Sequence, residues 1–247
     1  MLTLQEQQVE AELTAKRAEQ IGWPSQNVNF FRTNYKIYQV PNQIKFYEFG
    51  HHQELDDVVV SDFFKSQTTG RFLCIGSANG IDQTHSLIQK GWAGVYCEPD
   101  PAALVGNSSQ LTGLFHATTE FRDKIVIVNA AITATSGICN FYINKTIALS
   151  TTKKEWSNSD SIPIIINSVG VNQLLDYVGE DFDYVQIDAE GADFEILNTI
   201  DWSKRLPNCK LIGVELGIEN WTQLWNQGNY IMASVTEHNK YFRRLDL

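Results

Sequence analysis

Two acidic residues, Asp188 and Glu190, stand two positions apart in the segment IDAEGADFE, directly after an apolar run. Alternate residues of a strand share a face, and in the turn after a strand both carboxylates can still reach one cleft. A third acid, Glu215, ends a later apolar run. Burying carboxylates together is costly unless they meet a cation, a shared proton or hydrogen-bond donors. We therefore predict a functional centre at these acids, with Asp188 and Glu190 as its catalytic residues.

The chemistry of Asp188 is open at this stage. An ordinary aspartate, with a pKa of roughly 3.9, is a poor base for an alcohol. We expect Asp188 either to have a raised pKa, to orient a substrate, or to bind a divalent cation such as Mg²⁺ or Ca²⁺ together with Glu190. The structural alternative is that Glu190 caps the following helix and Asp188 contacts only backbone amides. No residue is assigned as a metal ligand.

A glycine-containing turn follows the first strong apolar run, in the segment FLCIGSANG, residues 72–80. Gly76 ends the run, and Gly80 follows four residues later at the start of a predicted helix. Glycines let a backbone approach a ligand closely, and ligands of open α/β sheets bind beyond the carboxyl ends of the strands. The segment lacks both the G-x-G-x-x-G dinucleotide pattern and the G-K-[ST] of a P-loop, so a phosphate cradle is not predicted.

An acid ends the second apolar run, in GWAGVYCEPDP, where Glu98 occupies the carboxyl end of the predicted strand. A carboxylate there can accept hydrogen bonds from both hydroxyls of a ribose. An adenosine ligand without phosphates matches an acid that has no phosphate cradle beside it. These two segments therefore favour S-adenosylmethionine over a nucleotide as the ligand.

Strands alternating with helices must position these residues. The predicted strands cover residues 71–75, 94–97, 124–128, 184–187 and 211–216, and a closing hairpin covers 230–235 and 241–245. The predicted helices cover 53–66, a segment ending near 89, 169–178 and 192–199, with a further extended piece at 138–143 and a flexible loop at 144–161. This order predicts an α/β fold with a Rossmann-like, doubly wound, mostly parallel seven-stranded sheet and helices on both faces.

The first 69 residues differ in character from the remainder. Residues 3–20 lack Gly and Pro and predict a helix, and the aromatic-rich residues 28–49 predict short strands. We expect residues 1–69 to form a helical and strand extension that packs on a ligand-binding domain of residues 70–247. The thin apolar face of its helix makes the extension a candidate surface for a homo-oligomer.

Composition excludes several classes of function. The 247 residues carry a formal net charge of −10, which disfavours non-specific nucleic-acid binding. The chain has neither an apolar run of about 18 residues nor an apolar N-terminal signal segment, so neither a membrane span nor secretion is predicted. The four cysteines lack zinc-like spacing. We expect a cytoplasmic protein.

Six segments in order resemble the FkbM-type family of S-adenosylmethionine-dependent methyltransferases, with the class I methyltransferase fold. The order and spacing agree over residues 46–247. The matching segments are HQELDD (52–57), FLCIGSANG (72–80), GWAGVYCEPDP (91–101), IVIVNAAI (125–132), YVQIDAEGADFEIL (184–197) and LIGVEL (211–216).

The resemblance assigns cofactor-binding roles to individual positions. It places Glu98 on the ribose and Gln53 and Asp57 near the cofactor's entrance. The loop around the methionine part would be Gly76, Ser77, Ala78, Asn79 and Gly80, and Asn129 and Ala130 would lie beside the adenine. The chain departs from the family where Cys74 replaces an Asp in the first strand and Gln186 replaces a frequent Lys in the fourth.

The leading hypothesis is an S-adenosylmethionine-dependent O-methyltransferase, which methylates a hydroxyl of a sugar, glycan or small metabolite. The substrate class comes from the resemblance alone. An N-methyltransferase of a small molecule or peptide is the nearest rival. Cys74 and the Gln-rich N-terminus motivate a hypothesis from another class, a catalytically silent binding or assembly module. A dinucleotide-dependent oxidoreductase is disfavoured by the missing third glycine.

Overall fold

The computed structural model describes residues 55–78, 81, 83–105, 113–145, 149–215, 224, 227–236 and 238–247, with the two-residue strand β1 at Lys36–Ile37. The helix predicted over residues 3–20 and nearly all of the strands predicted over 28–49 lie outside the described residues. Within the described part, no helix is both long and apolar enough to cross a membrane.

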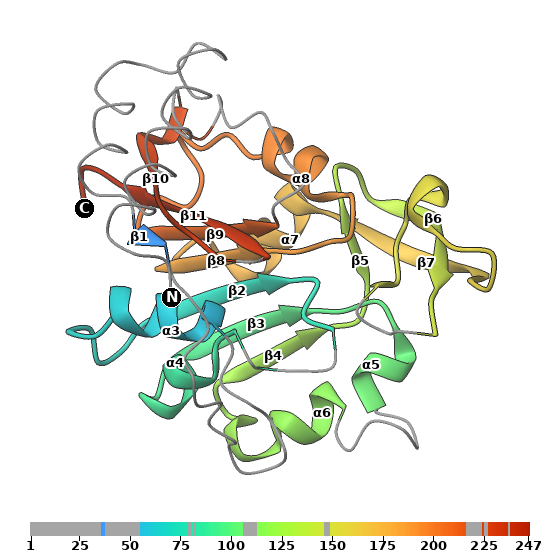
Figure 1. Cartoon of the computed structure of the whole chain (residues 1–247), viewed down its shortest axis with the longest axis horizontal. Helices are drawn as coiled ribbons and strands as arrows, with labels where there is room; N and C mark the ends of the chain where they lie inside the picture. The colour runs from blue at the N-terminus through green and yellow to red at the C-terminus, as the bar shows by residue number, and fades with distance from the viewer. Residues whose placement is uncertain are drawn as a thin grey trace.

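One large sheet organises the chain, in the order β1-β10-β11-β9-β8-β2-β3-β4 (Figure 1). Its remaining strands are β2 (Arg71–Ile75), β3 (Ala93–Cys97), β4 (Ile125–Val128), β8 (Tyr184–Ile187), β9 (Leu211–Glu215), β10 (Tyr230–Val235) and β11 (Asn239–Arg244). The five strands from β9 to β4 are parallel, and β11 is antiparallel to both of its neighbours. The predicted seven-stranded, mostly parallel sheet is thus confirmed, and β1 adds an eighth strand at the edge.

Helices cover both faces of this sheet because its strands are apolar on both sides. In β2, Phe72 and Cys74 pack on one face, while Leu73 and Ile75 pack on the other. The first face is covered by α3 (Leu55–Phe63), α4 (His85–Gln89), α5 (Pro101–Val105) and α6 (Leu114–Ala117). The second is covered by α7 (Val171–Val178) and α8 (Asp193–Thr199). This is the doubly wound arrangement, with a hydrophobic core on each face.

A second, three-stranded sheet stands beside the carboxyl ends of the large one (Figure 1). It contains β5 (Ala131–Thr133), β7 (Ile162–Gly170) and β6 (Gly137–Ile143), in that order. Strand β7 was not predicted, and the helix expected from residue 169 begins at 171 because residues 169–170 complete that strand.

The predicted loop over residues 144–161 contains two short ordered elements in the part that the structure describes. Thr151 forms an antiparallel bridge with Tyr142 of β6, with backbone hydrogen bonds in both directions. A short 3₁₀ helix, η4 (Lys154–Trp156), follows. The backbone polar groups of this segment therefore form hydrogen bonds within the protein instead of with water alone. The segment also contributes to the lining of the functional cavity.

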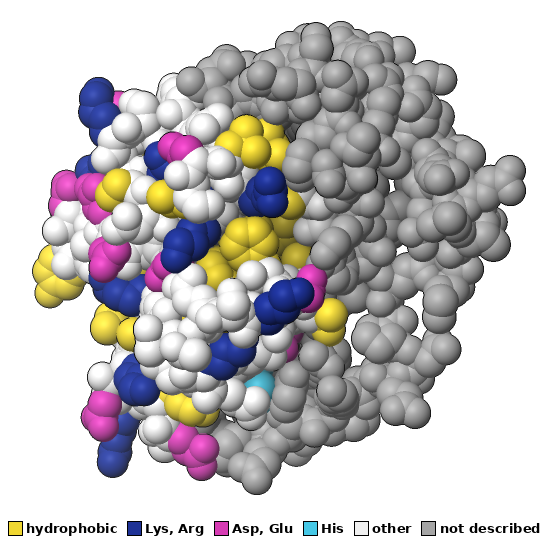
Figure 2. Space-filling model, turned by 90° about the vertical axis from the view of Figure 1, so that its left-hand side faces the viewer, with side chains coloured by type: hydrophobic (Ala, Val, Ile, Leu, Met, Phe, Trp, Pro, Cys, Tyr) yellow, Lys and Arg dark blue, Asp and Glu magenta, His cyan; other side chains and the backbone are white. Residues whose placement is uncertain are grey.

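The face at the amino ends of the strands carries charged side chains of both signs. In its described part, Lys and Arg side chains lie among Asp, Glu and apolar side chains (Figure 2). Asp183 accepts hydrogen bonds from the backbone of Arg71 and from Lys210 Nζ, at 3.1 and 2.8 Å, so these charges join neighbouring strands. The candidate site lies at the opposite ends of the strands.

Candidate active site

A cavity of about 500 Å³ opens where β2, β3, β8 and β9 end, between the two sheets. Its walls include the turn at Gly76, the segment of Glu98, the turn at Asp188–Glu190 and Glu215 at the end of β9. Ala131 and Phe141 of the small sheet close another side. Parallel strands place their carboxyl ends at one edge, which explains why segments far apart in sequence meet here.

The turn after β2 is held tightly between its neighbours. Gly76 has φ +77°, and a Cβ at this position would lie 1.7 Å from the carbonyl oxygen of Asp188. Its N–H donates to Cys97 O at 2.9 Å, and Asp188 N–H donates to Ile75 O at the same distance. Only glycine therefore allows the turn to approach β8 so closely. The next turn residue, Ala78, also has a left-handed backbone, with φ +49°.

Glu98 is oriented by two backbone amides. Its Oε2 accepts from Ala78 N–H and its Oε1 from Asp100 N–H, each at 2.7 Å. The side chain is 5% exposed, and burial raises the pKa of Glu98 to about 8 even though both amide donors act in the opposite direction. In the ionised form, which the two amide donors favour, each carboxylate oxygen keeps a further acceptor position, so Glu98 can then accept two more hydrogen bonds from a ligand.

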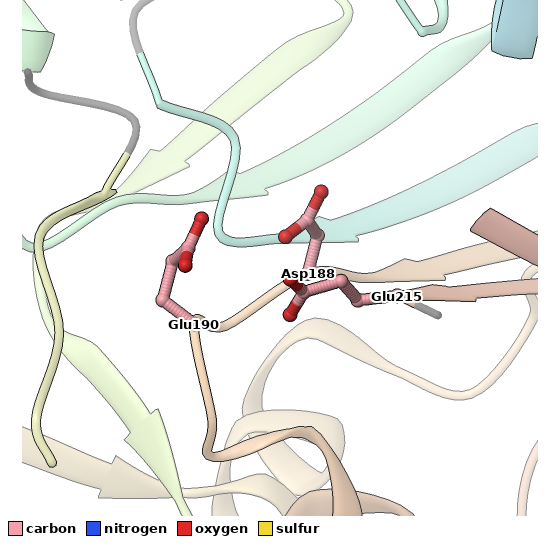
Figure 3. A group of neighbouring side chains, drawn as sticks. All are labelled: Asp188, Glu190 and Glu215. Carbon is pink, nitrogen blue, oxygen red and sulfur yellow. The ribbon is translucent and has the colours of Figure 1, made fainter. Parts of the chain in front are cut away.

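Three carboxylates of the cavity lining, those of Asp188, Glu190 and Glu215, lie close together at the ends of β8 and β9 (Figure 3). One oxygen atom from each of Asp188, Glu190 and Glu215 lies within 4.8 Å of the others. Burial, followed by the charge of Glu215, raises the pKa of Asp188 well above its ordinary value. Burial likewise raises the pKa values of Glu190 and Glu215 to about 7. These acids hold protons near neutral pH that ordinary carboxyls would release.

The structural role considered for Glu190 falls to another residue. Asp193, in the first turn of α8, accepts from Ala189 N–H at 2.7 Å and from Gly191 N–H at 3.0 Å. Glu190 itself has a left-handed backbone, with φ +48°, and its carbonyl accepts from Thr151 Oγ1 at 2.6 Å. Because Asp193 satisfies the amides of the turn, the carboxylates of Asp188 and Glu190 are left facing the cavity.

The other predicted positions divide into three groups. Ser77, Ala78 and Ala130 line the cavity, and the buried Ser77 hydroxyl has no hydrogen-bond partner within the described part of the chain. Asn129 is exposed and outside the lining, where its Nδ2 donates to Glu98 O at 2.9 Å and supports that segment. Gln53, Asn79 and Gly80 lie outside the described residues.

The neighbouring acids Asp56 and Asp57 have different surroundings. Asp57 is fully buried away from the cavity lining and accepts from Ser86 N–H at 3.0 Å and Ser86 Oγ at 2.5 Å. Asp56, which the sequence did not single out, lines the cavity, as do Gln83 and His238. Two adjacent acids in the first turn of a helix gave no signal as to which one faces the ligand space.

The two departures from the family pattern are both buried. Cys74 lines the cavity, and its pKa is raised well above the ordinary value by burial, so its thiol stays neutral. Gln186 is fully buried, accepts from Tyr184 OH at 2.5 Å and donates to Asn239 Oδ1 at 2.8 Å. Neutral hydrogen-bonding groups therefore occupy the sheet here.

Comparison with known proteins gives weak structural matches and one clear family match. The chain is 11% identical to yhhF from Escherichia coli, named as a methyltransferase, with a TM-score of 0.42 and coverage of 86% of this chain and 92% of that one. Monomeric WbdD is 10% identical, with a TM-score of 0.42, over 76% of this chain and 40% of that chain. No curated protein matches the sequence.

The family match covers most of the chain. The family model of the methyltransferase FkbM domain matches residues 75–244, which run from the end of β2 to the end of β11 and include the glycine turn, Glu98 and the three clustered carboxylates. This range contains every strand of the large sheet from β3 onwards, together with the last residue of β2, and it excludes β1. The chain therefore belongs to the FkbM methyltransferase domain family.

Proposed function

We propose that this methyltransferase uses S-adenosylmethionine and methylates a hydroxyl group of a sugar, glycan or small metabolite. The observation that carries the cofactor assignment is Glu98, a buried carboxylate held by two backbone amides at the edge of a cavity. Its remaining acceptor positions suit the two ribose hydroxyls of an adenosine. Methyltransferase activity follows from the family, and the hydroxyl acceptor follows from the chemistry of the acidic cluster.

The described residues provide for the chemically distinct parts of the cofactor. Glu98 would hold the ribose, and Ala130 would lie against the adenine. The Gly76–Ala78 turn would pass beside the methionine part, where the Ser77 hydroxyl offers an unused hydrogen-bonding group. When bound, the cofactor supplies an electrophilic methyl group on a sulfonium. Positioning an acceptor in line with that methyl accounts for much of the rate that such a site must provide.

The acidic cluster supplies the proton chemistry that an alcohol acceptor needs. A hydroxyl must lose its proton as it attacks, and a base is most effective when its pKa lies near the working pH. The pKa values of Glu190 and Glu215, at about 7, meet this condition. We assign Glu190 as the proton acceptor. Asp188, whose pKa burial raises well above its ordinary value, orients the acceptor oxygen through a hydrogen bond.

A divalent cation is the alternative occupant of the same cluster, because three carboxylate oxygens form a hard ligand set of the kind that Mg²⁺ and Ca²⁺ prefer. Turnover after chelation separates the two arrangements. A proton-accepting cluster keeps its activity in a chelator, whereas a cation-dependent cluster loses it and recovers on addition of Mg²⁺.

Transfer of a labelled methyl group tests the proposed function directly. The full chain is incubated with S-adenosylmethionine carrying a radioactive methyl group and with panels of hydroxyl-bearing and amine-bearing acceptors. We expect label in hydroxyl acceptors. Label that enters only amines would replace the O-methyltransferase proposal with the N-methyltransferase alternative.

The free cysteines agree with the reducing cytoplasm in which we expect the enzyme to work.

A further inference from the structure

Asp56 is a buried acid at the edge of the cavity whose interactions use only one of its oxygens. It stands in the first turn of α3, is 2% exposed and lines the cavity. Thr236 Oγ1 and Tyr241 OH both donate to its Oδ1, at 2.8 and 2.6 Å. Both donors come from the β10–β11 region, so the carboxylate is fixed in orientation.

The second oxygen, Oδ2, has no partner among the residues that the structure describes. No Lys, Arg or His in that part of the chain forms an ion pair with Asp56, and His238, which lines the same cavity, is not within ion-pair distance. A charged carboxylate taken out of water is costly unless a cation or further donors meet it. The cavity is the space from which such a cation can come.

The other acids of the cavity are less suited to a permanent cation. Glu98 already accepts from two amides and faces the ribose position. The pKa values of Asp188 and Glu190, which are both half-buried, are raised by loss of solvent and by the charge of Glu215, so both carboxyls hold protons near neutral pH. The Cys74 thiol is neutral. Asp56 is therefore the cavity acid that hydroxyl donors hold by one oxygen and whose other oxygen has no partner in the described part of the chain.

We propose that Asp56 binds the α-ammonium group of the S-adenosylmethionine methionine, and so fixes the amino-acid end of the cofactor while Glu98 fixes its ribose. This inference rests on the proposed use of S-adenosylmethionine. An ammonium group has three hydrogen-bond donors and is mainly charged at neutral pH, and the free Oδ2 of Asp56 offers it a carboxylate acceptor inside the cavity. Asp56 is a binding residue in this role and takes no part in proton transfer.

A set of ligands that differ only at the amino-acid end tests the proposal by calorimetric titration. S-adenosylhomocysteine carries the ammonium group, its deaminated analogue lacks that group alone, and 5′-methylthioadenosine lacks the whole amino-acid end. We expect Asp56→Asn to weaken S-adenosylhomocysteine binding by about 10–100-fold, the loss of one charge-assisted contact. Binding of the deaminated analogue and of 5′-methylthioadenosine should change by less than about 2-fold.

Asp160→Asn is the matched control, since it removes an exposed acid outside the cavity lining and should leave discrimination between the amino-bearing and deaminated ligands intact. Loss of that discrimination in Asp160→Asn as well would show that the effect does not come from Asp56 and would overturn the assignment. Equal weakening of all three ligands in Asp56→Asn would also overturn it, because a merely structural role affects every ligand. A wild-type chain that binds none of the ligands would refute the proposed function itself.

A second variant keeps the test decisive if Asp56→Asn does not fold, as judged by circular dichroism and thermal melting. Thr236→Val keeps the carboxylate but removes one of the two hydroxyls that orient it. We expect a loss of about 2–10-fold for S-adenosylhomocysteine and no change for 5′-methylthioadenosine. Unchanged binding of S-adenosylhomocysteine by a folded Thr236→Val protein would count against the role of Asp56.

Discussion

The cavity contains two kinds of acidic side chain at the ends of neighbouring strands, and they differ in what holds them in place. Glu98 is held by the amides of Ala78 and Asp100, so its shape is set before a ligand arrives. Asp188, Glu190 and Glu215 are instead held against one another, and burial together with repulsion between their charges raises their pKa values. The first arrangement suits recognition of a neutral diol, whereas the second suits the gain and loss of a proton.

Glu190→Gln tests the role of the clustered acids in catalysis. The amide keeps the size of the side chain but cannot accept the proton of the acceptor hydroxyl. We expect O-methylation to fall by at least about 100-fold, within the range of general acid–base contributions. Methyl transfer to an acceptor that presents a neutral amine should be largely retained, because a neutral amine can attack without losing a proton first.

The measurement is kcat for a hydroxyl acceptor and an amine acceptor, with the KM for S-adenosylmethionine as the control for cofactor binding. Asp160→Asn, in an exposed ion pair with Lys145, is the matched variant and should behave as wild type. Unchanged turnover of the hydroxyl acceptor by Glu190→Gln would remove Glu190 from the mechanism.

Among the elements, the β2 turn is the one that the site depends on most. Gly76 has a left-handed backbone and lies very close to Asp188, the residue that follows β8. The carbonyl oxygen of Asp188 occupies the space that a side chain at position 76 would need. Gly76→Ala should reduce the free energy of unfolding by about 3 kcal/mol or more, through steric overlap and backbone strain, and should abolish cofactor binding. Chemical denaturation and ligand titration measure the two effects.

Gly137→Ala is the control for the turn, because Gly137 also has a positive φ, at +155°, but no atom lies within 4 Å of the position that a Cβ would occupy there. Gly137→Ala introduces backbone strain, as Gly76→Ala does, but no steric overlap with neighbouring atoms. The free energy of unfolding should therefore fall by less than in Gly76→Ala, and ligand binding should be retained. Equal losses in the two variants would show that strain alone, and not the approach to β8, makes Gly76 necessary.

The sequence predicted the strands that carry the site, since β2, β3, β8 and β9 are apolar runs buried on both faces. It did not predict β7, whose Ile162 and Ile165 are 64% and 72% exposed and whose pairing with β6 spans a long polar segment. The clustering of Asp188 with Glu215 followed from strand ends meeting at one edge. The choice of Asp56 over Asp57 did not follow, because adjacent helical residues point about 100° apart and only the packing of α3 fixes which one faces the cavity.

For the whole molecule, the buried acids link stability to pH. The folded-state pKa values of Glu190 and Glu215, about 7, and of Glu98, about 8, lie above their ordinary values. The folded chain therefore binds more protons than the unfolded one in this range, so this contribution to stability is present below about pH 4.5 and is lost as pH rises through about 7–8.

We accordingly expect the free energy of unfolding, from urea denaturation of the ligand-free chain, to decrease between about pH 5.5 and pH 8. Glu215→Gln removes one member of the cluster and relieves the repulsion on Asp188 and Glu190, so its slope against pH should be smaller. A slope that is absent in the wild type, or that steepens in Glu215→Gln, would contradict the buried, protonated cluster described here.

Binding of S-adenosylhomocysteine by Glu98 tests the central claim most directly. In calorimetric titration we expect the wild-type chain to bind it with a Kd in the micromolar range, and Glu98→Gln to bind about 10–100-fold more weakly, because an amide cannot accept from Ala78, Asp100 and two ribose hydroxyls at once. Glu195→Gln, at an exposed acid of α8, should bind as wild type. Absence of binding by the wild-type chain at about 1 mM ligand would contradict the cofactor site and favour a catalytically silent binding module.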